Sequence, residues 1–224
     1  MSKSTNYKLP AFARDILGED GGVPWDKAIS LPAMNAYSGL VNDSFHRFSG
    51  LTDLDSVLFY ESKFAIDGDG SGGETPGDTF LPDTSLHFGN GKPLNAHHFP
   101  FAVIPLARSI DKAIGFENDP LRVRLGDVGI AFWKNRRAAF VYGDRGPKWK
   151  KVGEGSMNLA DLLGINSDPN VGGIGASEVP PGVIHLCFPG TTDVENLSDP
   201  RTSRTPGQIA QLAEELFMKL VHSH

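Results

Sequence analysis

The sequence predicts a mainly β protein folded as a small closed barrel with short helices. Several short runs either alternate apolar and polar residues or are wholly apolar, which is the pattern of strands. The 26 glycines and 16 prolines among 224 residues favour many turns. Only the carboxyl-terminal segment carries a long helical pattern. Short strands, glycine-rich corners and few helices together indicate a barrel with loops at its rims.

Three of the expected strands are set by their apolar patterns. Residues 56–67, SVLFYESKFAID, alternate apolar and polar side chains and are expected to form one strand. Residues 99–105, FPFAVIP, form a continuous apolar run, which indicates a strand buried on both faces. Residues 183–190, VIHLCFPG, form another central strand, ended by Pro-Gly. Cys187 is the single cysteine, so we expect a small buried side chain and no disulfide within the chain.

A β-hairpin is expected between these strands. Residues 127–134 and 136–144 flank Asn135, where a short turn would fold them together. The alternation predicts one shared face across the hairpin, made by Val128, Ile130, Phe132, Phe140 and Tyr142.

Two helices complete the domain. Residues 157–164 read as a short helix, which Ser156 would cap at its start and Gly164 would end. The tail from Thr205 is the clearest helix, because Thr205 and Gln208 fit a capping box and Pro206 fits the first helical position. Its apolar stripe predicts packing on the core and consists of Ile209, Leu212, Ala213, Leu216, Phe217 and Leu220.

Length and charge bound the function classes. We expect a single domain, with residues 1–55 as an amino-terminal arm that carries short helical turns near 8–17 and 31–41, and residues 56–224 as the barrel. The net charge of −6 argues against a nucleic-acid surface and suits a cationic polymer as partner. No apolar run of 18 residues is present, so no membrane helix is expected. We also expect a monomer.

The segment VYGDRGPKWKKVGEGS, residues 141–156, places two carboxylates at the ends of expected strands. Asp144 lies in GDRGP, and Glu154 follows ten residues later in GEGS. Two carboxyl groups on adjoining strand rims are what glycoside hydrolysis requires, one to protonate the leaving oxygen and one to act on the other face of the sugar. The alternative is that GDRGP is only a turn, since aspartate bonds its own backbone and glycine supplies positive φ.

The chain resembles glycoside hydrolase family 75, the fungal and bacterial endo-chitosanases. The matching blocks span residues 58–190 in the order of the family and are KFAIDGDG (63–70), PFAVIP (100–105), GDVGIAFWKNRRAAFVYGD (126–144), VGEGS (152–156) and VIHLCFPG (183–190). The resemblance implies a six-stranded double-psi-like barrel and an inverting hydrolase without a cofactor that cuts β-1,4 bonds of a glucosamine-containing polysaccharide. It also implies Asp144 and Glu154 as the catalytic pair, and we assign Glu154 as the acid and Asp144 as the base.

The resemblance further implies which residues contact the substrate. In the matched blocks these are Lys63, Asp67, Asp69, Tyr142 and Ser156, and the two aspartates would pair with glucosaminium groups by charge-assisted hydrogen bonds. Trp149 is a candidate platform on which a sugar ring stacks.

The sequence predicts no metal site. The Asp67–Asp78 loop opens as D-x-D-x-S-G, which can hold calcium, but it has strand rather than helix before it and no glutamate at its last position. His97 and His98 are adjacent, so on a strand they would point to opposite faces and could not both bind one metal with His87.

Two observations keep other interpretations open. Lys148 and Lys150 would repel glucosaminium, so a hydrolase of the same chemistry acting on peptidoglycan or chitin, such as a delivered antibacterial enzyme, is the first rival. A barrel that binds polysaccharide without turnover is the second. The family is secreted and fungal members commonly carry a cysteine where this chain has Gly68, yet no signal peptide is visible at residues 1–17, so the compartment is left open.

Overall fold

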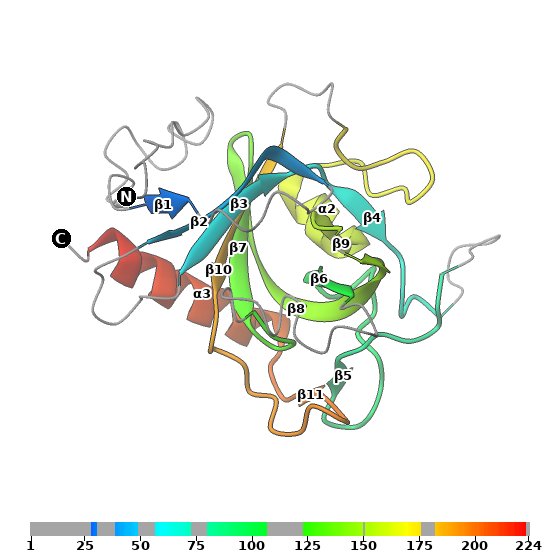
Figure 1. Ribbon diagram of the computed structural model, residues 1–224. Coiled ribbons are helices and arrows are strands. Elements are labelled where there is room, and N and C mark those ends of the chain that lie inside the picture. Colours follow the sequence, from blue (N-terminus) through cyan, green and yellow to red (C-terminus); the bar gives the residue numbers. More distant parts are fainter. Residues whose placement is uncertain are drawn as a thin grey trace.

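The computed structural model describes residues 28–30, 39–48, 57–72, 80–106, 123–149, 151–175 and 182–222. Over these ranges the protein has a nine-stranded curled sheet, a two-stranded sheet and two helices (Figure 1). The curled sheet forms a half-barrel, which confirms the prediction of a mainly β fold. Neither of the described helices is long and apolar enough to cross a membrane.

The strands and helices have the following bounds. The strands are β1 (Ala28–Ser30), β2 (Leu40–Phe48), β3 (Leu58–Ser62), β4 (Ala65–Asp67), β5 (His87–Phe88), β6 (Phe101–Leu106), β7 (Val128–Trp133), β8 (Arg136–Trp149), β9 (Glu154–Ser156), β10 (Val183–Phe188) and β11 (Arg201–Thr202). The helices are α2 (Met157–Leu163) and α3 (Pro206–Val221). The order in the large sheet is β1-β2-β3-β10-β7-β8-β6-β9-β4, and β11 pairs with β5 in the small sheet.

The break between β3 and β4 explains why the sheet curls. Only Lys63 and Phe64 separate these strands, yet β3 pairs with β10 and β4 pairs with β9 at the far edge. Segments that adjoin in the chain therefore lie at distant places in the sheet order, and only a curled sheet brings them together. At the break, Lys63 N donates to Gly39 O (2.8 Å) and Phe64 N to Ile174 O (3.1 Å). The prediction of one continuous strand over residues 56–67 was therefore wrong.

The hairpin was predicted correctly, but its facing pairs were not. Strands β7 and β8 pair from Trp133↔Arg136, so the turn consists of Lys134 and Asn135, and Lys134 adopts a positive φ of 51°. Phe140 lies opposite Gly129, not opposite Val128, Ile130 or Phe132. Gly129 accommodates the aromatic ring, because a Cβ there would lie 2.4 Å from Phe140 Cζ.

The amino-terminal arm contributes strands to the sheet. β1 pairs with β2 and β2 pairs with β3, where the rings of Phe45 and Tyr60 lie 5.0 Å apart. The helical turn expected at residues 31–41 is thus wrong at its end, since Leu40 already belongs to β2. The turn expected at residues 8–17 lies outside the described residues. Register with β3, rather than local sequence pattern, decides the structure of β2.

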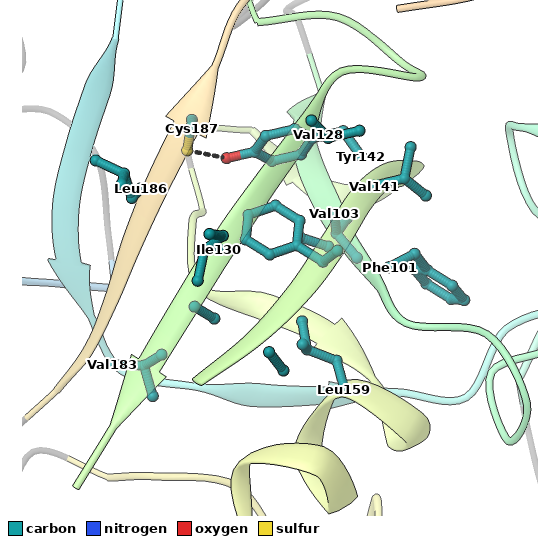
Figure 2. Close-up of a cluster of buried hydrophobic side chains, with 14 of the residues drawn as sticks. Phe101, Val103, Val128, Ile130, Val141, Tyr142, Leu159, Val183, Leu186 and Cys187 are labelled. Atoms are coloured by element: carbon teal, nitrogen blue, oxygen red, sulfur yellow. Dashed lines mark hydrogen bonds between the residues drawn. The ribbon is translucent and has the colours of Figure 1, made fainter. Parts of the chain in front are cut away.

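The core lies inside the curl and beneath the two helices. All six residues of β10 are buried between β3 and β7, which confirms a central strand (Figure 2). The Cys187 thiol is buried there, with its Sγ 2.8 Å from the Tyr142 hydroxyl. Ser156 caps α2 and Gly164 ends it, and Thr205 and Gln208 form the predicted capping box of α3. Phe217 of α3 packs on Phe132 at 5.8 Å between ring centroids.

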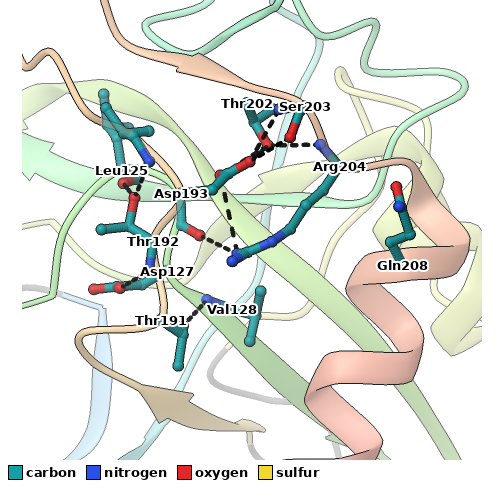
Figure 3. Close-up of polar contacts among 12 residues, drawn as sticks. Leu125, Asp127, Val128, Thr191, Thr192, Asp193, Thr202, Ser203, Arg204 and Gln208 are labelled. Carbon is teal, nitrogen blue, oxygen red and sulfur yellow. Dashed lines mark hydrogen bonds and ion pairs between the residues drawn. The ribbon is translucent and has the colours of Figure 1, made fainter.

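Two aspartates anchor the chain that follows β10 through hydrogen bonds. Asp127 is fully buried and accepts hydrogen bonds from the backbone N–H groups of Arg124 (2.7 Å) and Thr192 (2.9 Å). Asp193 accepts hydrogen bonds from the Thr202 hydroxyl (3.0 Å) and the Ser203 N–H (2.9 Å), as Figure 3 shows. These contacts fix the loop that carries β11 to its partner β5, and the two loops wall one side of the candidate site.

Candidate active site

Asp144 and Glu154 flank the same strand. In the register of the sheet, Asp144 on β8 lies opposite Val103 of β6, and Gly155 on β9 lies opposite Ala102 of β6. Because β6 and β9 are antiparallel, Glu154 also lies opposite Val103, on the side of β6 that faces away from β8. Two strand spacings place the two Cα atoms about 9.6 Å apart in a flat sheet. The topology therefore brings together the two acids that the sequence analysis paired.

Gly146 gives Glu154 room to reach toward Asp144. A Cβ at Gly146 would lie 3.5 Å from Glu154 Oε2 and 3.0 Å from Val103 Cγ1. Gly146 is two residues beyond Asp144, a distance of about 6.6 Å along a strand. The Glu154 carboxylate thus leans over β6 toward β8, and a side chain at residue 146 would crowd Val103 first. Lys151 Nζ lies 3.2 Å from Glu154 Oε2 and forms an ion pair with it.

The Asp144 carboxylate is held by three hydrogen-bond donors. Its Oδ1 accepts from Ser85 N (2.8 Å), Ser85 Oγ (2.6 Å) and Arg145 N (2.7 Å). Only 5% of Asp144 is exposed. Burial raises the pKa of Asp144 above its ordinary value, and the bonds from Ser85 and Arg145 oppose that rise because they stabilise the ionised form. The carboxylate is fixed in orientation and has one oxygen left for a further partner.

Asp67 ends β4, Asp69 follows two residues later, and both face the same region. Asp67 Oδ1 accepts from Asp69 N (2.8 Å), and Asp69 Oδ1 accepts from Leu81 N (2.8 Å). Burial raises the pKa of Asp67 well above its ordinary value, and the charges of Asp144, Asp69 and Glu154 add to the rise. Burial, with the charges of Asp144 and Glu154, raises the pKa of Asp69 to about 6.

Three of the acids form a compact cluster. Asp67, Asp69 and Asp144 each offer a carboxylate oxygen, and these oxygens lie within 4.8 Å of one another. Among the described residues this is the group whose spacing could admit a cation. Asp78, at the other end of the Asp67–Asp78 loop, lies outside the described residues. The prediction of no metal stays a prediction.

A pocket of about 390 Å³ opens beside Asp144. Its walls come from the segment 81–87, from the segment 198–200, and from Asp69, Asp144 and Arg145. The paired strands β5 and β11 join the first two walls, so the polar contacts of Asp193 indirectly shape the pocket. A larger hollow of about 660 Å³ lies along α3 and touches none of these acids.

The other residues predicted to contact the substrate lie in different environments. Lys63 is exposed at the break between β3 and β4. Tyr142 is fully buried, with its hydroxyl bonded to Cys187 and 3.2 Å from that of Tyr60. Ser156 is fully buried, where its hydroxyl donates to Phe99 O and caps α2. A side chain with no exposed surface does not reach a ligand, so Tyr142 and Ser156 support the site from the core. Trp149 ends β8, and its side chain lies outside the described part of the chain.

Sequence reasoning missed Ser85 and the loop at residues 198–200. Ser85 stands 59 residues before Asp144 and carries no motif, so nothing in its local sequence connects it with the acid. The segment 193–204 is rich in Asp, Thr and Ser, which is a turn signal without chemical content.

No protein-family model and no curated protein matches the chain. The chemistry of this site therefore has to be inferred from its own residues.

Proposed function

We propose that this protein is a glycoside hydrolase that uses Asp144 and Glu154 to cleave β-1,4 bonds in a glucosamine-containing polysaccharide. The observation that carries the proposal is the placement of the two acids on either side of β6, with Asp144 lining an open pocket. Two strand spacings of about 4.8 Å each separate their positions in the sheet, and with Glu154 leaning toward β8 this placement is compatible with the 6.5–9.5 Å between carboxyl groups that single displacement requires. No cofactor is needed for this reaction.

In the proposed reaction Asp144 is the base. Its three donors keep the carboxylate in one orientation, so that it can take a proton from a water molecule as the water oxygen bonds to the anomeric carbon. Glu154 gives its proton to the glycosidic oxygen as the bond between that oxygen and the anomeric carbon breaks. One proton is gained at Asp144 and one is lost at Glu154, and exchange with solvent restores both.

The ion pair with Lys151 must open before Glu154 can act as the acid. Lys151 Nζ occupies the Oε2 side of Glu154, and the side chain of Lys151 is partly exposed. A cationic sugar entering the site would repel the Lys151 ammonium group and free Glu154 Oε2 to face the glycosidic oxygen. We therefore propose that substrate entry opens the ion pair between Lys151 and Glu154.

We also propose that the half-barrel is a closed six-stranded barrel. If β3 and β4 are counted as one bent strand, the order β3-β10-β7-β8-β6-β9-β4 returns to its first member and gives six strands. A closed six-stranded double-psi-like barrel of this kind would place Asp67, Asp144 and Glu154 on one rim.

Lys151 and Arg145 favour keeping peptidoglycan or chitin as the second candidate substrate. Both side chains are cations next to the proposed pair, and they would tolerate an acetylated or anionic polymer better than a polycation. Either polymer would be cleaved by the same two-acid mechanism, so the two candidates differ only in substrate selectivity.

A substrate panel tests the proposal. Reducing-end release is measured on soluble chitosan, on chitin oligomers and on cell-wall sacculi, and the anomeric form of the first product is read by NMR. We expect cleavage of chitosan with inverted configuration. Retained configuration would refute single displacement, and binding of a polymer without any product would favour a non-catalytic barrel.

A further inference from the structure

We infer that Thr84 is a positioning residue whose hydroxyl group holds Ser85 against the Asp144 carboxylate and thereby fixes the orientation of the base. Thr84 acts through Ser85. The inference rests on the proposed function, in which Asp144 is the base. No motif marks Thr84, which lies in the segment PDTSLHF, residues 82–88.

The Thr84 hydroxyl closes a small turn of the chain around Ser85. Its Oγ1 donates to Leu86 O (2.8 Å) and accepts from Leu94 N (2.9 Å). The first bond joins the two neighbours of Ser85 and therefore restricts the backbone dihedral angles of Ser85. The second bond attaches the turn to the fully buried Leu94, ten residues later. Thr84 is itself only 4% exposed, so this support lies in the protein interior.

The same turn lies against β8 at the position of the base. Leu86 N donates to Gly143 O (2.9 Å), and Gly143 is the residue before Asp144. Ser85 N and Ser85 Oγ both donate to Asp144 Oδ1, at 2.8 Å and 2.6 Å. The third donor to Oδ1 is Arg145 N (2.7 Å), which also lies 3.2 Å from Ser85 Oγ. A shift of Ser85 would therefore break two of the three bonds that orient the carboxylate.

The Thr84 hydroxyl is already engaged, although Thr84 lines the pocket. A hydroxyl group has one proton to donate, and that of Thr84 goes to Leu86 O. A sugar could accept a hydrogen bond from this hydroxyl only if that bond broke. Thr84 therefore supports Ser85 and does not bind the sugar.

Two conservative substitutions separate the hydroxyl group of Thr84 from its shape. Thr84→Val keeps the branched shape and removes the hydroxyl, whereas Thr84→Ser keeps the hydroxyl. The amide proton shift of Ser85 is measured by NMR in the full chain, because an N–H that donates to a carboxylate resonates downfield. We expect this signal to move upfield in Thr84→Val, toward its position in Asp144→Ala, which lacks the acceptor. It should stay near the wild-type position in Thr84→Ser, and an unchanged signal in Thr84→Val overturns the inference.

Thr191 provides a matched control, because its hydroxyl makes the same pair of bonds elsewhere. Thr191 Oγ1 donates to Phe188 O (2.7 Å) and accepts from Val128 N (2.9 Å). Thr84→Val and Thr191→Val each leave two backbone groups without their partner, so we expect a lower melting temperature in both. Only the first variant should affect the reaction.

Kinetics then separate positioning from general support and from substrate contact. We expect Thr84→Val to lose about 10- to 10²-fold in kcat with KM within about twofold, and Thr84→Ser and Thr191→Val to keep kcat within about threefold of the wild type. An equal loss of kcat in Thr84→Val and Thr191→Val would overturn the inference, and so would a rise in KM alone in Thr84→Val. A wild type inactive on every polymer refutes the proposed function, and the Ser85 amide signal still decides whether Thr84 positions Ser85.

Discussion

His185 should contribute to the sensitivity of this protein to mild acid, and His185→Phe should remove that contribution. The imidazole is fully buried on β10, stacked on Tyr60 at 4.8 Å and on Phe64 at 6.1 Å between ring centroids. Its Nε2 has no hydrogen-bond partner among the described residues. Burial lowers the pKa of His185 from 6.5 to about 4, and a backbone hydrogen bond with Val183 only partly opposes this.

The sign and size of the effect follow from linkage. Above pH 6.5 the imidazole is neutral in both states and contributes nothing to the pH dependence. As pH falls from 6.5 toward 4, the unfolded chain binds the proton first, so the folded state loses stability. Between pH 8 and pH 5 this single group accounts for about 2 kcal/mol, which corresponds to about 4 to 8 °C in melting temperature for a chain of this size.

The assay is urea unfolding of the wild type and of His185→Phe at pH 8 and pH 5. Phenylalanine keeps the stacking with Tyr60 and cannot be protonated, so the difference in unfolding free energy between wild type and variant should change by about 2 kcal/mol from pH 8 to pH 5. The exposed His222, changed to alanine, is the matched control and should leave the pH dependence as in the wild type. An identical pH dependence in wild type and His185→Phe would refute the assignment of a neutral, buried imidazole.

Three further perturbations probe the site and its support. Lys151→Met removes the ion pair that must open before Glu154 can act and should raise kcat, whereas a large loss of kcat in the folded variant would show that Lys151 serves the reaction. Gly146→Val places carbon where Val103 and Glu154 now meet and should cost about 10²-fold in kcat and about 1 to 3 kcal/mol of unfolding free energy through overpacking, whereas unchanged kcat would show that the close approach is irrelevant. Asp127→Asn turns an amide donor toward backbone N–H groups and should lower the unfolding free energy by about 2 to 4 kcal/mol, measured in urea, and a neutral result would refute the role of Asp127 in fixing the loop.

Local signals predicted the elements whose structure is decided locally. The caps of α2 and α3, the hairpin turn at Asn135, and the burial of β10 all follow from short-range patterns, although the turn also includes Lys134, which was expected in the strand. Each depends on neighbours within a few residues or on the apolar content of one run.

Long-range register explains the errors. The split of residues 56–67 into β3 and β4 depends on Gly39, Gly153 and Ile174, whose backbone groups bond to the break, and none of these is near it in sequence. The position of Phe140 opposite Gly129 likewise depends on a one-residue shift in register, which moves every side chain to the other face.

The candidate site shows the same division. Asp144 and Glu154 could be found because two acids among glycines form a recognisable pattern. The support of Asp144 by Ser85, and its closeness to Asp69, could not be found, since both depend on how the loop after β4 folds back on β8. Tyr142 and Ser156 were assigned to the cleft because a sequence block does not distinguish a residue that lines a site from one that supports it.

The most direct test of the two-acid account is reducing-end release by the wild type, Asp144→Asn and Glu154→Gln, with thermal melts to establish that each variant is folded. Each substitution keeps the shape of the side chain and removes its ability to transfer a proton. We predict an active wild type and two folded variants slower by about 10²- to 10⁴-fold. Folded variants that retain full activity would contradict the assignment of Asp144 and Glu154 as the catalytic pair.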